Sequence, residues 1–98
     1  MSYTLIFDAE AYQDIKEAYN YYFDEAGPKI AELFNDDLQE AFKALQINPF
    51  YQIRTKNYRA LPLKKFPFLL FFQVFEQKPK VKILALFNTN QDTEKYPK

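Results

Sequence analysis

The segment FLLFFQVF, residues 68–75, constrains the fold of this chain more than any other stretch. Its nearly continuous apolar and aromatic residues are typical of a β-strand that is covered on both faces. The strand pleat divides them into two sets, Phe68, Leu70, Phe72 and Val74 on one side and Leu69, Phe71, Gln73 and Phe75 on the other. One set fits against helices. The other set is covered either by the loop 48–57 and the C-terminal tail or by a partner protein.

Two amphipathic helices are expected before this strand. Apolar residues recur with helical spacing between residues 9 and 47, and Asp8 stands where an N-cap residue would accept hydrogen bonds from the first turn. The pair Gly27–Pro28 divides the stretch, because glycine ends a helix readily and proline suits the first helical position. Asn48–Pro49 closes the second helix, since a residue before proline avoids the helical conformation.

Three further strands complete the expected fold. YTLIF (3–7), YRALPL (58–63) and VKILALF (81–87) are rich in β-branched and aromatic residues, and Pro62 indicates an edge strand or a bulge. The order is therefore β-α-α-β-β-β, an α+β fold in which a helical hairpin packs on an antiparallel sheet. Residues 1–98 are expected to form a single domain.

Composition excludes several kinds of chemistry. The chain has no histidine and no cysteine, so it offers no imidazole base, no thiolate nucleophile and no zinc site of the usual kind. Glu10, Asp14 and Glu17 share a helical face, which is far more typical of a solvated acidic surface than of a cation site. Asp36 and Asp37 diverge by about 100° around their helix and form no catalytic pair. We expect neither a metal nor a cofactor.

The two halves of the chain carry opposite charge although the net charge is zero. Residues 1–48 hold ten acidic and three basic residues, and residues 49–98 hold three acidic and ten basic ones. Either a basic face meets an acidic partner or nucleic acid, or acidic helices and a basic sheet attract each other within the fold. Candidate binding residues are Arg54, Lys56, Arg59, Lys64 and Lys65, interleaved with Tyr51, Tyr58 and Phe66, together with Lys82.

Basic and aromatic residues in this pattern suit contact with RNA, because cations pair with phosphates and aromatic rings stack on bases. Lysines that protect a sheet edge from mispairing would give the same pattern. The N-terminus turns acidic after five or six residues, unlike a signal peptide, and the longest apolar run is too short to span a membrane. We therefore expect a cytoplasmic location.

The chain resembles the RelE/ParE superfamily of bacterial type II toxin–antitoxin toxins over nearly its whole length. The resemblance rests on an ordered set of segments, AYQDIKEAYNYY, FNDDLQEAFKALQINP, YRALPLKKFPFLLFFQV and VKILALFNTNQDTEKY. It implies a small cytoplasmic toxin that a cognate antitoxin holds inactive. Toxins of this superfamily either cleave mRNA at the ribosome or poison DNA gyrase.

The resemblance also bears on individual residues. Tyr96 matches a tyrosine of the RNA-cleaving members, whereas Arg59 lies near the start of its strand without a secure counterpart. Where those members carry arginines, this chain has Leu69 and Asn90, and Asn88 stands in the region where many relatives carry histidine. Cleavage needs a base, an acid and charge stabilisation, which asparagine supplies poorly.

The favoured hypothesis is a ParE-like toxin that does not cleave RNA, binds an antitoxin, and has a cellular protein target such as DNA gyrase. Its expected binding residues are Arg54, Lys56, Arg59, Lys64, Lys65, Lys82 and Tyr96. Zero net charge argues against a ribosome or RNA partner. The alternatives are a diverged ribosome-dependent mRNA interferase that uses Tyr96, and a family member that only binds its antitoxin.

Overall fold

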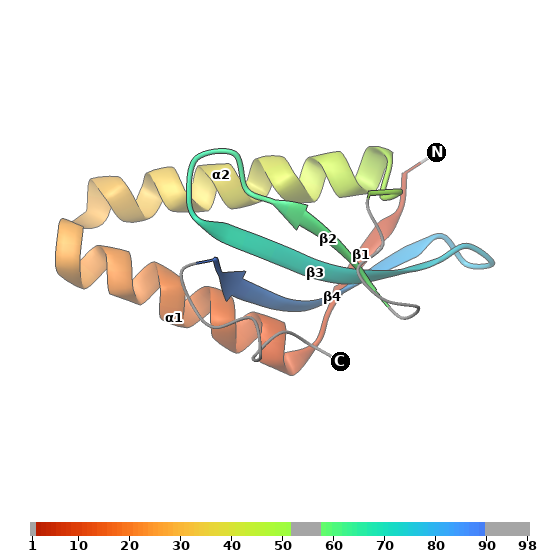
Figure 1. Cartoon of the computed structure of the whole chain (residues 1–98), viewed down its shortest axis with the longest axis horizontal. Coiled ribbons are helices and arrows are strands. Elements are labelled where there is room, and N and C mark those ends of the chain that lie inside the picture. Colours follow the sequence, from red (N-terminus) through yellow and green to blue (C-terminus); the bar gives the residue numbers. More distant parts are fainter. Residues whose placement is uncertain (1, 52–57, 90–98) are drawn as a thin grey trace.

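The computed structural model describes residues 2–51 and 58–89, which form two helices packed against a four-stranded sheet (Figure 1). The elements are β1 (Thr4–Phe7), α1 (Ala9–Ala26), α2 (Pro28–Ile47), β2 (Arg59–Pro62), β3 (Phe68–Phe75) and β4 (Lys80–Asn88). This order confirms the α+β fold and the β-α-α-β-β-β sequence of elements. Neither of the two described helices is long and apolar enough to cross a membrane.

The strand order in the sheet is β1-β4-β3-β2. Strands β2, β3 and β4 form the expected antiparallel meander, and β2 lies at an edge, as Pro62 indicated. The sheet as a whole is mixed rather than antiparallel, because β1 pairs in parallel with β4. A parallel neighbour needs a long crossover connection, and the helices between β1 and the meander provide one.

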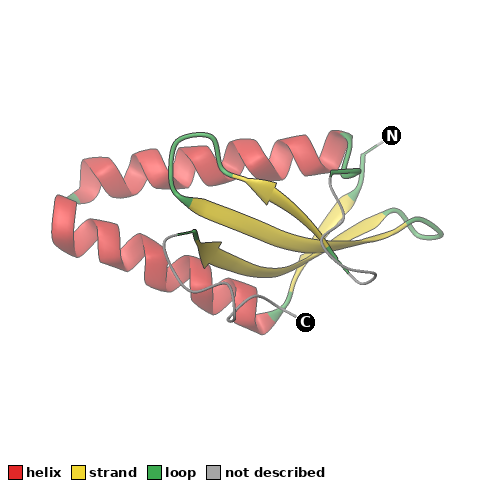
Figure 2. Ribbon diagram, in the orientation of Figure 1, coloured by secondary structure: helices red, strands yellow, loops and turns green. Residues whose placement is uncertain are grey.

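The helical hairpin turns at Gly27, which ends α1 and precedes α2 (Figure 2). Its φ of 93° lies in a region that side chains with a Cβ rarely adopt. Its N–H donates to the carbonyl of Phe23 at 3.0 Å, and its own carbonyl accepts from Ala31 at 3.2 Å. Asp8 occupies the N-cap position of α1 as expected, but its side chain makes no capping hydrogen bond.

The main core lies between the helices and one face of the sheet. Of the two β3 sets that the strand pleat defines, the one with Phe68, Leu70, Phe72 and Val74 faces the helices, and Phe72 and Leu70 are fully buried beside Phe34 of α2. The ring centre of Tyr22 of α1 lies 5.3 Å from that of Phe34 and 5.1 Å from that of Phe66, which precedes β3. Burying each such large side chain contributes about 1.5–3 kcal/mol, so these contacts join both helices to β3.

The opposite face of the sheet is divided into two parts. Toward the start of β3, Leu69 and Phe71 are buried in a second cluster with Tyr58, Ala60 and Phe87. Toward the end of the same strand, Phe75 is 45% exposed. The expected internal cover for this face lies largely outside the described residues, which omit 52–57 and 90–98.

Candidate functional site

The structure distributes the predicted site residues over separate places instead of gathering them. Arg54, Lys56 and Tyr96 lie outside the described residues. The four that are described are Arg59 at the start of β2, Lys64 and Lys65 in the β2–β3 turn, and Lys82 in β4. These three places differ in their environment.

Arg59 is engaged within the fold. It lies opposite Phe72 of β3, so its side chain projects from the face that packs on the helices. Its Nη1 donates to the carbonyl oxygen of Tyr51 at 2.8 Å, and its guanidinium carbon lies 5.3 Å from the ring centre of Phe50. Among the described residues no acidic side chain pairs with it. Arg59 therefore holds the segment that follows α2 against the sheet.

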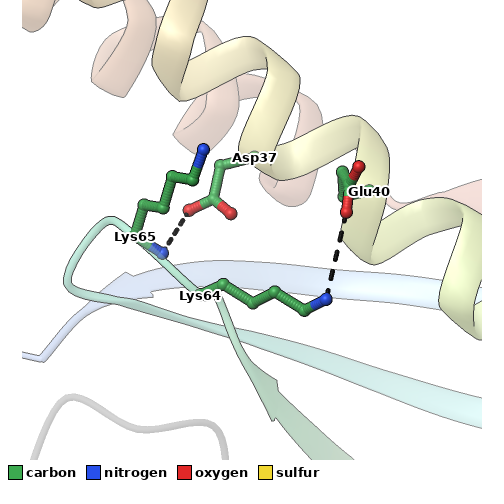
Figure 3. A network of polar contacts seen from close by, with 4 residues as sticks. All are labelled: Asp37, Glu40, Lys64 and Lys65. Carbon is green, nitrogen blue, oxygen red and sulfur yellow. Dashed lines mark hydrogen bonds and ion pairs between the residues drawn. The ribbon is translucent and has the colours of Figure 1, made fainter.

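The β2–β3 turn is anchored to α2 by a buried acid. Asp37 is only 5% exposed, and its Oδ2 accepts hydrogen bonds from the backbone N–H groups of Lys65 at 2.9 Å and Phe66 at 3.0 Å. Lys64 lies 3.9 Å from Glu40 in an ion pair whose side chains are 82% and 65% exposed (Figure 3). Such an exposed pair contributes little, so the backbone bonds to Asp37 carry the anchoring.

The sequence analysis did not assign this role to Asp37. A signal was nevertheless present, since Asp37 lies three residues after Phe34 and four before Ala41, inside the buried stripe of α2. An acid at a buried helical position needs hydrogen-bond donors, and the β2–β3 turn supplies them.

Asp14 plays a similar role on α1. Strand β1 ends at Phe7, opposite Ile83, so the later part of β4 has no neighbouring strand on that side. The Oδ2 of Asp14 accepts a hydrogen bond at 3.2 Å from the N–H of Leu86 there. The acidic stripe of α1 was expected to be fully solvated, and this expectation is wrong for Asp14.

Burial raises the pKa of the Asp14 carboxyl above its ordinary value, although the hydrogen bond from Leu86 opposes that change. The nearby charges of Glu10 and Glu17 raise it further. The described part of the chain contains no group of three acidic, histidine or cysteine side chains that could hold a metal ion.

Lys82 differs from the other described candidates because it projects from the opposite face of the sheet. Its neighbours Val81 and Ile83 are buried against the helices, so Lys82 points away from them. Lys80 lies on the same outer face, and neither lysine forms an ion pair within the described residues. Lys80 is the first residue of β4, which begins one residue before the strand expected over 81–87, and its alternation with Val81 and Lys82 follows the period of a strand.

A shallow hollow of about 260 Å³ lies between the two helices. It is lined by Tyr12, Ile15, Lys16, Tyr19, Asn20 and Asn35. The lining contains no carboxylate, and Lys16 is its one charged side chain.

Comparisons with known proteins agree with this architecture. A family model described as the ParE toxin of the type II toxin–antitoxin system parDE matches residues 5–93. Among solved structures, the chain is similar to the chromosomal ParDE toxin–antitoxin system from P. aeruginosa, with 25% identity and a TM-score of 0.74. That match covers 89% of this chain and 96% of the other. A search of curated protein sequences finds no match.

Two structures of RelE type share the fold at lower identity. The toxin–antitoxin complex RelBE2 from Mycobacterium tuberculosis has 17% identity and a TM-score of 0.61, covering 90% of this chain and 99% of that one. The isolated E. coli RelE toxin has 17% identity and a TM-score of 0.57, covering 95% and 90%. The fold is thus that of the RelE/ParE toxins. The chain belongs to the ParE toxin family of type II toxin–antitoxin systems.

Proposed function

We propose that this chain is a cytoplasmic toxin that arrests growth by binding a cellular protein, without cleaving RNA, and that a cognate antitoxin neutralises it by binding. The similar solved structures include a ParDE system and RelBE toxin–antitoxin complexes, which supports an antitoxin partner for this chain. DNA gyrase is the candidate target that the resemblance to ParE-like toxins implies.

The environment of Leu69 carries the proposal that RNA is not cleaved. The resemblance aligns this position with an arginine of the RNA-cleaving members of the superfamily. Here it is a leucine with 6% exposure, packed in the cluster that contains Tyr58 and Phe71. An apolar side chain buried at this place can stabilise neither a phosphate nor its transition state.

The positions of the basic residues favour binding over catalysis as well. Arg59 and Lys82 project from opposite faces of the sheet, and Lys64 and Lys65 lie in the turn that α2 anchors. Cleavage by general acid–base chemistry needs its groups to converge on one phosphate. Separated cations instead suit contacts with carboxylates over an extended partner.

The test combines growth with RNA integrity. The wild-type chain is expressed from a tightly controlled promoter in bacteria, and mRNA ends are mapped during arrest and after incubation of purified protein with translating ribosomes. We expect arrest with intact mRNA, together with relaxed or broken DNA if gyrase is the target. New mRNA ends that depend on the ribosome would overturn the proposal in favour of an mRNA interferase.

A second comparison separates a toxin from a family member that only binds an antitoxin. Soluble wild-type protein that accumulates without arrest would contradict the proposed toxicity. Co-expression of a candidate antitoxin should restore growth, and the two proteins should purify together. Arrest that persists although the two proteins form a complex would contradict neutralisation by binding.

A further inference from the structure

Six residues from three neighbouring strands, four of them exposed and two half-buried, form one surface at the end of the sheet that carries the β3–β4 turn. In the register, Thr4 of β1 lies beside Lys80 of β4, which lies beside Phe75 of β3. One step further along, Ile6 lies beside Lys82, which lies beside Gln73. Residues paired in this way project from the same face of a sheet. We call these six residues the lysine face.

The lysine face points away from the helices. The residues that alternate with its members pack against the helical core, namely Leu5 in β1, Val81 in β4 and Val74 in β3. The pleat therefore directs the lysine face to the other side of the sheet. Figure 1 shows that the β3–β4 hairpin extends beyond the ends of both helices.

The positive charge of the lysine face is not neutralised by the described part of the fold. Lys80 is exposed and Lys82 is half-buried. Within the described residues neither of them forms an ion pair, since the pair found there joins Lys64 and Glu40. Lys78, in the adjoining turn, adds a third exposed cation. Residues 75–82 hold these three lysines and one acidic residue, Glu76 in the same turn. The remaining excess of positive charge favours a partner that brings carboxylates or phosphates.

Apolar side chains flank Lys80 and Lys82 and favour a peptide over a nucleic acid as the partner. Phe75 is 45% exposed on one side and Ile6 is 38% exposed on the other. The branched side chain of Ile6 offers no flat surface for a nucleic-acid base, whereas it suits an aliphatic side chain of a peptide.

We propose that the lysine face binds an acidic segment of the antitoxin, with carboxylates against Lys80 and Lys82 and apolar side chains against Ile6 and Phe75. The choice of the antitoxin as the source of this segment rests on the function proposed above. The surface combines two cations with apolar side chains on either side, and an acidic segment with interspersed leucines provides the complementary chemistry.

The test measures binding of a defined probe by fluorescence anisotropy at low and moderate salt. The probe is a fluorescein-labelled, glutamate-rich peptide with interspersed leucines. Comparison probes are the same peptide with glutamine in place of glutamate and an oligoadenylate RNA of equal length. The variants are Lys80→Glu/Lys82→Glu and the milder Lys80→Gln/Lys82→Gln. Lys29→Glu/Lys43→Glu on α2 is the control, since both lysines are exposed and the charge change is the same.

We expect the charge-reversed variant to bind the acidic peptide at least about tenfold more weakly, the glutamine variant to bind with intermediate affinity, and the control to change less than about twofold. Phe75→Ser should weaken binding of the acidic peptide relative to the wild type, but the salt dependence of its affinity should not decrease. Equal binding by the wild type and both Lys80/Lys82 variants would overturn the proposal. Tighter binding of the RNA than of the acidic peptide, lost in the same variants, would overturn it in favour of a nucleic-acid surface.

Failure of this inference and failure of the proposed function are distinguishable. If the wild type arrests growth but peptide binding does not depend on Lys80 and Lys82, the inference about the lysine face is wrong and the proposed toxicity stands. If the wild type does not arrest growth but peptide binding depends on both lysines, the proposed toxicity is wrong and the lysine face remains a peptide-binding surface. Dimerisation of the wild type through this face, abolished in the charge-reversed variant, would identify a second copy as the occupant and overturn the antitoxin assignment.

Discussion

The two ends of β3 both carry lysines, but the fold treats them differently. At the start of the strand, the turn containing Lys64 and Lys65 is tied to α2 by Asp37, and Lys64 pairs with Glu40. At the other end, Lys80 and Lys82 follow a turn that extends beyond the helices and have no ion-pair partner among the described residues.

The difference shows that the residue type alone does not mark a binding surface. Asp37 distinguishes the two ends, because a buried side chain accepts hydrogen bonds from the backbone of the first turn, whose lysine side chains remain exposed. The second turn is held instead by a backbone hydrogen bond at 3.0 Å from the N–H of Thr4 to the carbonyl of Pro79. Neither Lys80 nor Lys82 forms an ion pair within the described residues.

Asp37→Ala should have the largest effect on stability. It leaves the N–H groups of Lys65 and Phe66 without their acceptor, and we expect the free energy of unfolding to fall by about 3 kcal/mol. Urea denaturation followed by circular dichroism measures the change. Asp36→Ala is the matched control, because Asp36 is exposed and its loss should change stability by less than about 0.5 kcal/mol. Equal effects of the two substitutions would refute the anchoring role of Asp37.

Arg59→Ala should have an intermediate effect. The substitution removes the hydrogen bond to the carbonyl of Tyr51 and the contact with the Phe50 ring, so we expect a loss of about 1–2 kcal/mol. Arg59→Lys should recover part of that loss, since an ammonium group can still donate one hydrogen bond. An unchanged unfolding midpoint in Arg59→Ala would mean that Arg59 is not used structurally and would return it to the candidate binding residues.

Asp14→Asn should change how stability depends on pH. The raised pKa of Asp14 means that the folded state holds this proton more tightly than the unfolded state, where the ordinary value is 3.8. The resulting stabilisation is fully present below pH 3.8 and is lost as pH rises through the folded pKa. The stability of Asp14→Asn relative to the wild type should therefore increase with pH across that window. A difference between the two proteins that stays constant with pH would contradict this account.

Lys64→Ala should have the smallest effect. Its ion pair with Glu40 is long and exposed, so unfolding should change by less than about 0.5 kcal/mol. Thermal unfolding of Lys64→Ala, Glu40→Ala and the double variant gives the coupling between the two side chains directly. A coupling above about 1 kcal/mol would show that this turn is held by its lysine as well as by Asp37.

The elements that depend on local signals could be predicted from the sequence. Helical periodicity, the break at Gly27–Pro28 and the apolar run 68–75 determine the order of the elements and divide the β3 residues into two sets. Which of the two sets meets the helices is given only by the tertiary fold. The parallel pairing of β1 with β4 could not be predicted in this way, because it joins segments more than 70 residues apart and leaves no periodic pattern.

The candidate site was harder to predict for the same reason. Arg59 and Lys82 have similar sequence surroundings, but strand register places them on opposite faces of the sheet. The anchoring roles of Asp14 and Asp37 depend on which backbone donors the tertiary fold brings to them. Sequence alternation around Val81 was available, however, and could have joined Lys80 to Lys82 as one surface.

Residue-specific mapping of the bound probe tests the central contrast most directly. Isotope-labelled protein is titrated with the glutamate-rich peptide, and backbone amide shifts are followed by nuclear magnetic resonance. The account predicts changes concentrated in residues 4–6, 73–75 and 78–82, with the turn at Lys64 and Lys65 unaffected. Changes concentrated at Lys64 and Lys65, with the β3–β4 hairpin unaffected, would contradict it.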